Sequence, residues 1–101
     1  MDWMWTWSGE CFGYRDGYEL WTHDGKHVGK FCGDDVYGRD GRYLGEVMNQ
    51  NRLITNYAKS GWVKAPFAPY ARRAGYAKYA NCAGYAMYAG HQDFPKPDTF
   101  S

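Results

Sequence analysis

The sequence predicts a mainly β protein, in which an antiparallel meander of hairpins with a 16-residue period precedes an extended, polyproline-II-like segment. The first observation is a set of glycines sixteen residues apart, Gly13, Gly29, Gly45 and Gly61. Tight-turn sequences keep the same step at Gly9, Gly25 and Gly41. Alanine then occupies every third position from Ala65 to Ala89. We therefore expect a hairpin-repeat domain over residues 1–62 and an alanine/tyrosine triplet tail over residues 63–101.

The turn sequences predict the hairpins. Asp24-Gly25 and Asp40-Gly41 suit a type I′ turn, which needs positive φ at both central residues, and Ser8-Gly9 is a weaker version. Two-residue turns would pair an aromatic residue with an apolar one across the strands, and we expect these pairs to form the core. The expected pairs are Trp21 with Val28, Tyr37 with Leu44, and Trp5 with Phe12.

Glycines inside the expected strands predict irregular backbone there. Gly29 and Gly45 would weaken a strand, so their recurrence indicates a bulge, a sharp bend or a close backbone contact. The fourth unit, which starts at Leu53, has Tyr57 where the turn glycine is expected, and whether this hairpin forms stays open. About eight short strands are expected, and units that cannot bury their apolar pairs alone must stack or close into a ring or barrel.

Two adjacent units carry a family resemblance. The run Leu-Trp-Thr-His-Asp-Gly-Lys-His-Val-Gly-Lys-Phe, followed by Val-Tyr-Gly-Arg-Asp-Gly-Arg-Tyr-Leu-Gly-Glu-Val, resembles the bacterial 4-fold beta flower domain family. The resemblance covers roughly residues 5–56. It implies β hairpins around a four-fold axis, either within one chain or between four chains. It implies no activity.

The period of the tail favours polyproline II. An alanine stripe at every third residue would wind around an α-helix by about 60° per step, and a strand has period two. Polyproline II has three residues per turn, which gives an alanine face and an aromatic face. It makes no internal hydrogen bonds, so buried amides would need partners on neighbouring segments. A flexible tail and an ordinary helix over residues 76–89 are the alternatives.

Composition and charge limit the classes of partner. Twenty aromatic residues in 101 exceed what one small domain hides, so some should lie in a subunit interface or a ligand surface. The net charge of +1, without a basic or acidic block, argues against nucleic-acid and membrane-surface binding. We expect a homo-oligomer with no nucleic-acid partner.

The N-terminus and the cysteines indicate a cytoplasmic protein. The chain has neither a positive leader with an apolar segment nor eighteen consecutive apolar residues, so we expect no secretory signal and no membrane span. Leaderless export stays open. Three widely spaced cysteines without Cys-x-x-Cys favour reduced, packed thiols over a disulfide framework or a zinc site.

No residue pattern predicts catalysis. His23 and His27 have a helical metal-ligand spacing, but they flank a hairpin turn that sends them to opposite faces. Asp34 and Asp35 suit a solvated turn. The chain has no nucleophile elbow and no phosphate-binding glycine loop. We expect no enzyme activity, no catalytic residue, no cofactor and no metal.

These features lead to two hypotheses. The first is a non-catalytic structural protein that self-assembles into a ring or filament through its aromatic hairpins and its tail. The second is a binding module that presents Trp7, Trp21 and Tyr37 to a glycan or other planar ligand, although these rings also suit a core or an interface. The candidate interface or platform residues are Trp7, Trp21, Tyr37, Tyr43, Tyr70, Tyr76, Tyr79, Tyr85 and Tyr88.

Overall fold

The computed structural model describes residues 1–100 and is mainly β, as predicted. The strands are β1 (Asp2–Thr6), β2 (Cys11–Asp16), β3 (Glu19–Thr22), β4 (His27–Cys32), β5 (Asp35–Tyr37), β6 (Tyr43–Met48), β7 (Arg52–Asn56) and β8 (His91–Asp93). Two 3₁₀ helices, η1 (Tyr57–Lys59) and η2 (Pro97–Phe100), complete the described elements.

Seven strands close into a barrel. Strands β1 to β8 pair antiparallel with their neighbours in sequence order. Seven of them lie in residues 1–62, where about eight were expected, and β8 lies at residues 91–93. A parallel pairing of β1 with β7, with Trp5 opposite Arg52 and Thr6 opposite Leu53, joins the first strand to the seventh. This pairing closes the sheet. Strand β8 pairs with Ile54–Asn56 of β7, beyond the two residues that pair with β1.

The barrel interior has its own period of eight residues. Apolar side chains of the core cluster recur at this spacing on the first five strands, namely Met4, Phe12, Leu20, Val28 and Val36, and Phe31, Leu53 and Phe94 complete the cluster. Leu44 continues the series on β6 and packs against the same cluster while remaining partly buried. Side chains alternate between the two faces of a strand. Each member of the eight-residue series lies on the face of its strand that points into the barrel. The core therefore lies inside the barrel.

The hairpin turns differ from the predicted type I′ turns. In the first hairpin, the Thr6 amide donates to the Glu10 carbonyl oxygen (2.8 Å), and the Gly9 amide donates to the Thr6 carbonyl oxygen (2.9 Å). The second and third hairpins repeat these bonds sixteen and thirty-two residues later. Each loop thus has three residues, with glycine last at φ of 84 to 101°, the usual arrangement of a three-residue turn with a glycine bulge. The prediction of two-residue turns was wrong because Asp-Gly also fits this longer loop.

The longer loop changes the strand register. Trp21 lies opposite His27, Tyr37 opposite Tyr43 and Trp5 opposite Cys11, each beside a shift in register. The predicted pairs of Trp21 with Val28, Tyr37 with Leu44 and Trp5 with Phe12 were therefore wrong. One extra residue in the turn shifts the partner strand by one position, so its side chains switch between the inner and outer faces of the sheet. The apolar partners point into the barrel, and the three aromatic rings do not join that core cluster.

The two glycines inside strands each lie beside a shift in register, which is the bulge among the three predicted alternatives, and other residues approach them closely. A Cβ on Gly45 would lie 2.5 Å from Cδ1 of Phe94 and 2.6 Å from the carbonyl oxygen of Ile54. A Cβ on Gly29 would lie 2.9 Å from Cγ1 of Val36. Gly45 therefore leaves the space that the Phe94 ring occupies.

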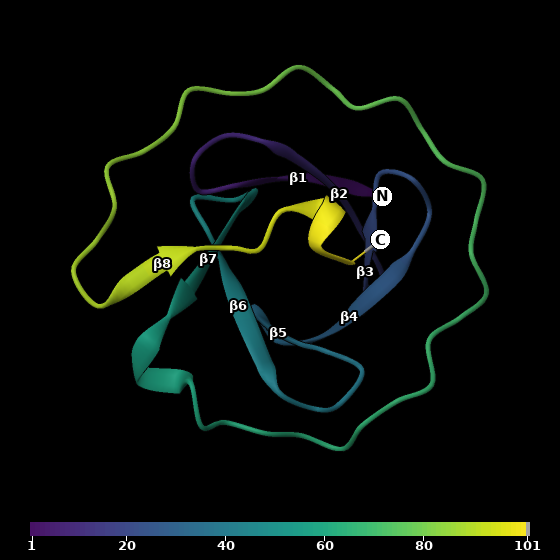
Figure 1. Ribbon diagram of the computed structural model, residues 1–101, viewed down its shortest axis with the longest axis horizontal. Coiled ribbons are helices and arrows are strands. Elements are labelled where there is room, and N and C mark those ends of the chain that lie inside the picture. The colour runs from purple at the N-terminus through teal and green to yellow at the C-terminus, as the bar shows by residue number, and fades with distance from the viewer. Residues whose placement is uncertain (101) are drawn as a thin grey trace.

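A long insertion interrupts the fourth hairpin. Strand β7 pairs with β8, with Asn56 opposite His91, but more than thirty residues separate these two positions in the sequence. Residues 64–90, which we call the belt, leave the barrel after η1 and run around its outside (Figure 1). Residues 64–88 contain neither helix nor strand, so the alternative of a helix over residues 76–89 was wrong.

The chain returns to the barrel after the belt. Phe94, which follows β8, is 1% exposed, belongs to the core cluster, and meets Phe12 edge-on with ring centroids 5.2 Å apart. Phe100 of η2 packs against the same cluster. Residues on both sides of the predicted boundary at residue 62 thus contribute to one core.

Candidate functional site: the belt and its contacts with the barrel

The belt contacts the three hairpin turns through repeated backbone hydrogen bonds. The amides of Lys64, Arg73 and Cys82 donate to the carbonyl oxygens of Gly41, Gly25 and Gly9 at 2.7, 2.8 and 2.8 Å, respectively. Three residues further along, the amides of Phe67, Tyr76 and Tyr85 donate to the carbonyl oxygens of Arg39, His23 and Trp7 at 3.0, 2.7 and 3.1 Å. Nine belt residues thus match sixteen barrel residues, and the belt meets the hairpins in reverse order.

The sequence contains a signal for this spacing that the triplet interpretation missed. The belt consists of three nine-residue units, Lys-Ala-Pro-Phe-Ala-Pro-Tyr-Ala-Arg, Arg-Ala-Gly-Tyr-Ala-Lys-Tyr-Ala-Asn and Cys-Ala-Gly-Tyr-Ala-Met-Tyr-Ala-Gly. The alanine period of three hides the longer period, since nine is a multiple of three. The belt has three nine-residue units, and the hairpins have three turn glycines, so these equal numbers could have suggested one belt unit for each hairpin.

The turn glycines also face the belt backbone. A Cβ on Gly9, Gly25 or Gly41 would lie 2.0 to 2.1 Å from the carbonyl oxygen of Cys82, Arg73 or Lys64, respectively. No side chain fits at that distance without displacing the belt. Glycine therefore serves twice at each turn, first for its positive φ and second for the close approach of another backbone.

An aromatic layer lies between the barrel and the belt. The rings of Trp3 and Tyr79 meet edge-on with centroids 4.7 Å apart, and those of Trp7 and Tyr85 lie 4.9 Å apart. The indole Nε1 of Trp7 donates to the carbonyl oxygen of Ala86 (3.0 Å), and that of Trp5 donates to Ala80 (3.0 Å). These contacts combine apolar area with a satisfied indole donor.

Two arginines fasten the belt through cation–π contacts. The guanidinium of Arg73 lies 3.9 Å from the centre of the Trp21 ring and forms an ion pair with Asp16 (2.8 Å). Arg52 of β7 is buried, lies 4.2 Å from the centre of the Tyr85 ring and donates to the carbonyl oxygens of Trp7 (3.2 Å) and Ala83 (2.7 Å). Neither arginine stands out in the sequence as a site residue, since each interrupts an otherwise apolar or aromatic pattern.

A buried histidine joins the second hairpin to the first belt unit. The amide of Tyr70 donates to Nδ1 of His27 (3.0 Å), which makes Nδ1 an acceptor and the ring neutral. Nε2 lies 2.8 Å from a carboxylate oxygen of Glu19 and 3.1 Å from the carbonyl oxygen of Gly29. The ring also stacks on Trp21 and Tyr70, with centroids 5.0 and 5.1 Å away. Burial lowers the pKa of His27 below its ordinary value, although the neighbouring carboxylate of Glu19 acts in the opposite direction.

We expect His27 to make stability depend on pH. Its pKa is lower in the folded protein than the ordinary value of 6.5, so the unfolded chain binds the proton first as pH falls. The free energy of unfolding should therefore be highest above about pH 6.5 and fall below it, by at most about 1.4 kcal/mol per pH unit. Thermal unfolding between pH 5 and pH 8 measures this slope. In the variant His27→Gln, which keeps an acceptor for the Tyr70 amide, the slope should be smaller, whereas His23→Gln should retain it. Equal slopes in the two variants would contradict the assignment.

The structure separates the predicted interface residues into two groups. Trp7, Trp21, Tyr37 and Tyr43 are buried between the barrel and the belt or beside it. The belt tyrosines remain about half exposed, with exposed fractions of 62% for Tyr70, 50% for Tyr76, 55% for Tyr79, 47% for Tyr85 and 50% for Tyr88. A ligand platform made of Trp7, Trp21 and Tyr37 would require displacement of the belt, since only 1 to 4% of each of these residues is accessible.

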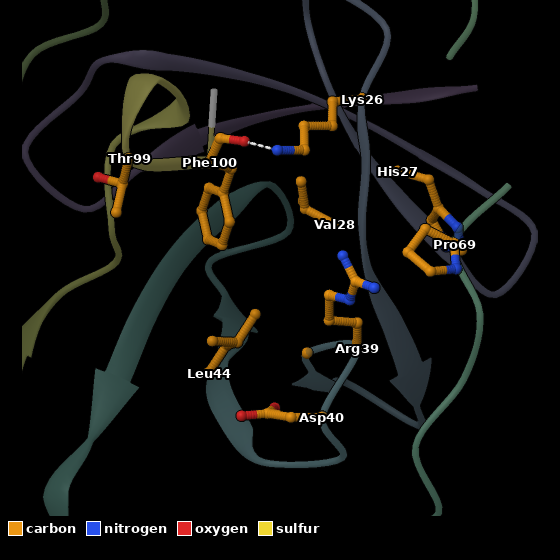
Figure 2. A pocket seen from close by; sticks show the side chains of 10 residues that line it. Lys26, His27, Val28, Arg39, Asp40, Leu44, Pro69, Thr99 and Phe100 are labelled. Carbon is orange, nitrogen blue, oxygen red and sulfur yellow. Dashed lines mark hydrogen bonds between the residues drawn. The ribbon is translucent and has the colours of Figure 1, made fainter. Parts of the chain in front are cut away.

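A cavity of about 590 Å³ lies between the second and third hairpin turns. Figure 2 shows Val28 and Leu44 of the barrel, Phe100 of η2 and Pro69 of the belt around this space, with Arg39 between them. Three separate parts of the chain therefore build its wall. Lys26 closes one side, because its ammonium group donates to the carbonyl oxygen of Phe100.

Asp35, one of the turn aspartates, has a structural partner, and so does the nearby Glu46. Lys59 binds the carboxylates of Asp35 (2.9 Å) and Glu46 (3.0 Å), so these acids form an ion-pair cluster. Burial raises the pKa of the Cys11 thiol, which disfavours the thiolate. Within residues 1–100, no three metal-ligating side chains gather into a site, and no helix is long and apolar enough to cross a membrane.

Comparison with known proteins adds no relative. No family model, no curated protein and no solved structure matches the chain.

Proposed function

We propose that the protein is a non-catalytic structural protein that self-associates through the belt. The observation that carries this proposal is the row of half-exposed tyrosines that the belt holds at the periphery, Tyr70, Tyr76, Tyr79, Tyr85 and Tyr88. The belt surrounds the barrel in Figure 1, and the molecule is a flat body measuring 36 × 34 × 21 Å. Neighbouring molecules could therefore meet rim to rim, as in a sheet or filament.

Physical chemistry favours such contacts. Tyrosine brings a large ring with a polar tip, and it is enriched in protein interfaces for this reason. The inner edges of the belt rings already pack on tryptophans, which limits the side-chain entropy that a second contact would cost. A net charge of +1 provides little repulsion between copies.

We further propose that the four hairpins of one chain supply the four-fold arrangement of the 4-fold beta flower resemblance. The three equivalent turns and the interrupted hairpin of β7 and β8 support this reading. A polyproline-II backbone for the belt is the companion proposal. Its support is the alanine period of three, together with amides that find partners outside the belt.

Light scattering coupled to size-exclusion chromatography tests self-association. The wild-type protein should elute as a multimer at micromolar concentration. The triple substitution Ala68→Glu, Ala77→Glu and Ala86→Glu places one carboxylate in each belt unit, at exposed positions beside the tyrosines. This variant should be a monomer with nearly unchanged thermal unfolding, since the tyrosine contacts with the barrel remain.

The matched control carries serine at the same three positions, which adds a small polar group without charge. It should remain a multimer. A folded wild-type monomer at this concentration would contradict the proposal, and so would an equal response to glutamate and serine.

A further inference from the structure

The cavity between the second and third hairpins combines apolar walls with an available cation. Val28, Leu44, Phe100 and Pro69 supply the apolar surface. The guanidinium of Arg39 points into the space between them (Figure 2). A volume of about 590 Å³ falls in the range of small-molecule sites, which are mostly apolar with a few polar groups that orient the ligand.

Arg39 is the polar group available for a ligand. Among residues 1–100, its side chain forms no hydrogen bond or ion pair. The neighbouring Asp40 is already engaged by Arg42, whose Nε lies 3.7 Å from one carboxylate oxygen and whose backbone amide donates to the other at 3.0 Å. A guanidinium can bind both oxygens of a carboxylate at once, which makes it selective for this group over a single point charge.

The surroundings keep this cation in place for a ligand. The carbonyl oxygen of Arg39 accepts the amide of Phe67, so the belt fixes the backbone of the turn that carries the side chain. On the opposite side, the bond from Lys26 to the carbonyl oxygen of Phe100 holds η2 over the cavity. The neutral ring of His27 lines the wall without a charge. The carboxylate of Asp40, which also lines the cavity, contacts Arg42.

We propose that this cavity binds a small carboxylate with an apolar body about the size of one aromatic ring. The carboxylate lies on the guanidinium of Arg39, and the ring lies against Phe100 and Leu44. This site is separate from the belt rim and does not depend on the proposed self-association.

A titration with phenylacetate, followed by NMR chemical shifts of the protein, tests the site. Saturable shifts should appear at the amides of Val28, Gly38, Leu44 and Phe100. Binding should weaken about tenfold or more in Arg39→Gln, because the variant loses the charge-assisted hydrogen bonds to the carboxylate. Arg72→Gln is the matched control, since this exposed arginine pairs with Asp24 and neither of these two residues lines the cavity. Its affinity should remain within about twofold of wild type, the effect expected of a distant surface charge.

A charge series separates recognition of the carboxylate from burial of the ring. Benzyl alcohol and benzylamine retain the ring but lack the anion, and both should bind at least about tenfold more weakly than phenylacetate. The proposal would be overturned by equal affinities across the series, by equal effects of the two arginine variants, or by no saturable binding at millimolar concentration.

Discussion

Replacing Phe94 with alanine should destabilise the protein by about 3–5 kcal/mol, because the change removes a fully buried aromatic ring from the barrel core. The Phe94 ring contacts Phe12 and lies against Gly45, which has no side chain. We therefore expect few neighbouring side chains to move into the cavity that the substitution creates. Urea unfolding of the wild type and the variant measures the difference in the free energy of unfolding.

The control for this prediction is Tyr18→Ala, which truncates an aromatic residue that is 69% exposed at the turn between β2 and β3. Its effect should stay within about 0.5 kcal/mol. If Phe94→Ala cost no more than the control, the segment after β8 would not belong to the core.

Replacing Gly25 with alanine should destabilise the protein by about 2–4 kcal/mol and release the middle of the belt. The left-handed conformation at φ +93° costs an alanine about 1–2 kcal/mol. The rest of the cost arises because the new Cβ would lie 2.1 Å from the carbonyl oxygen of Arg73, which forces the belt away from the turn. Hydrogen exchange at the amides of Arg73 and Tyr76 should become faster, and trypsin should cleave after Arg72 and Arg73 more readily.

The matched control is Gly33→Ala. Gly33 also has a positive φ, of +61°, but nothing lies within 4 Å of a Cβ built there. It should therefore show the conformational cost alone, about 1–2 kcal/mol, and leave the belt amides protected. Equal destabilisation by the two substitutions would mean that the belt contact contributes nothing.

The strands could be predicted from the sequence, but the face that each strand turns inward could not. Turn glycines and alternating apolar residues were sufficient for a mainly β fold, but seven strands lie in residues 1–62, where about eight were expected, and β8 lies in the predicted tail. The Asp-Gly sequences at residues 24–25 and 40–41 fit both two- and three-residue loops, and the choice shifts the register by one. Trp21 was therefore paired with Val28, when the barrel interior in fact follows the eight-residue series from Met4 to Leu44.

Residues 64–88 have neither helix nor strand, in line with the preference for a non-helical segment, but the place of the belt around the barrel could not be predicted. Tyr70, Tyr76 and Tyr85 show an aromatic face in the sequence, and only the fold reveals that their inner edges cover tryptophans of the same chain. His27 was considered as a metal ligand because of its spacing from His23. Its role as an acceptor for the Tyr70 amide depends on a contact across 43 residues, which local patterns do not encode.

The reverse order in which the belt meets the hairpins has a consequence for folding kinetics. The bonds from Lys64 to Gly41, from Arg73 to Gly25 and from Cys82 to Gly9 close loops of 23, 48 and 73 residues. The entropy lost on closing a loop grows with its length, so the shortest closure should form first and bring each later pair nearer. Assembly of the outer layer should thus proceed stepwise from its N-terminal end, and the contact with the first hairpin should be the last to form.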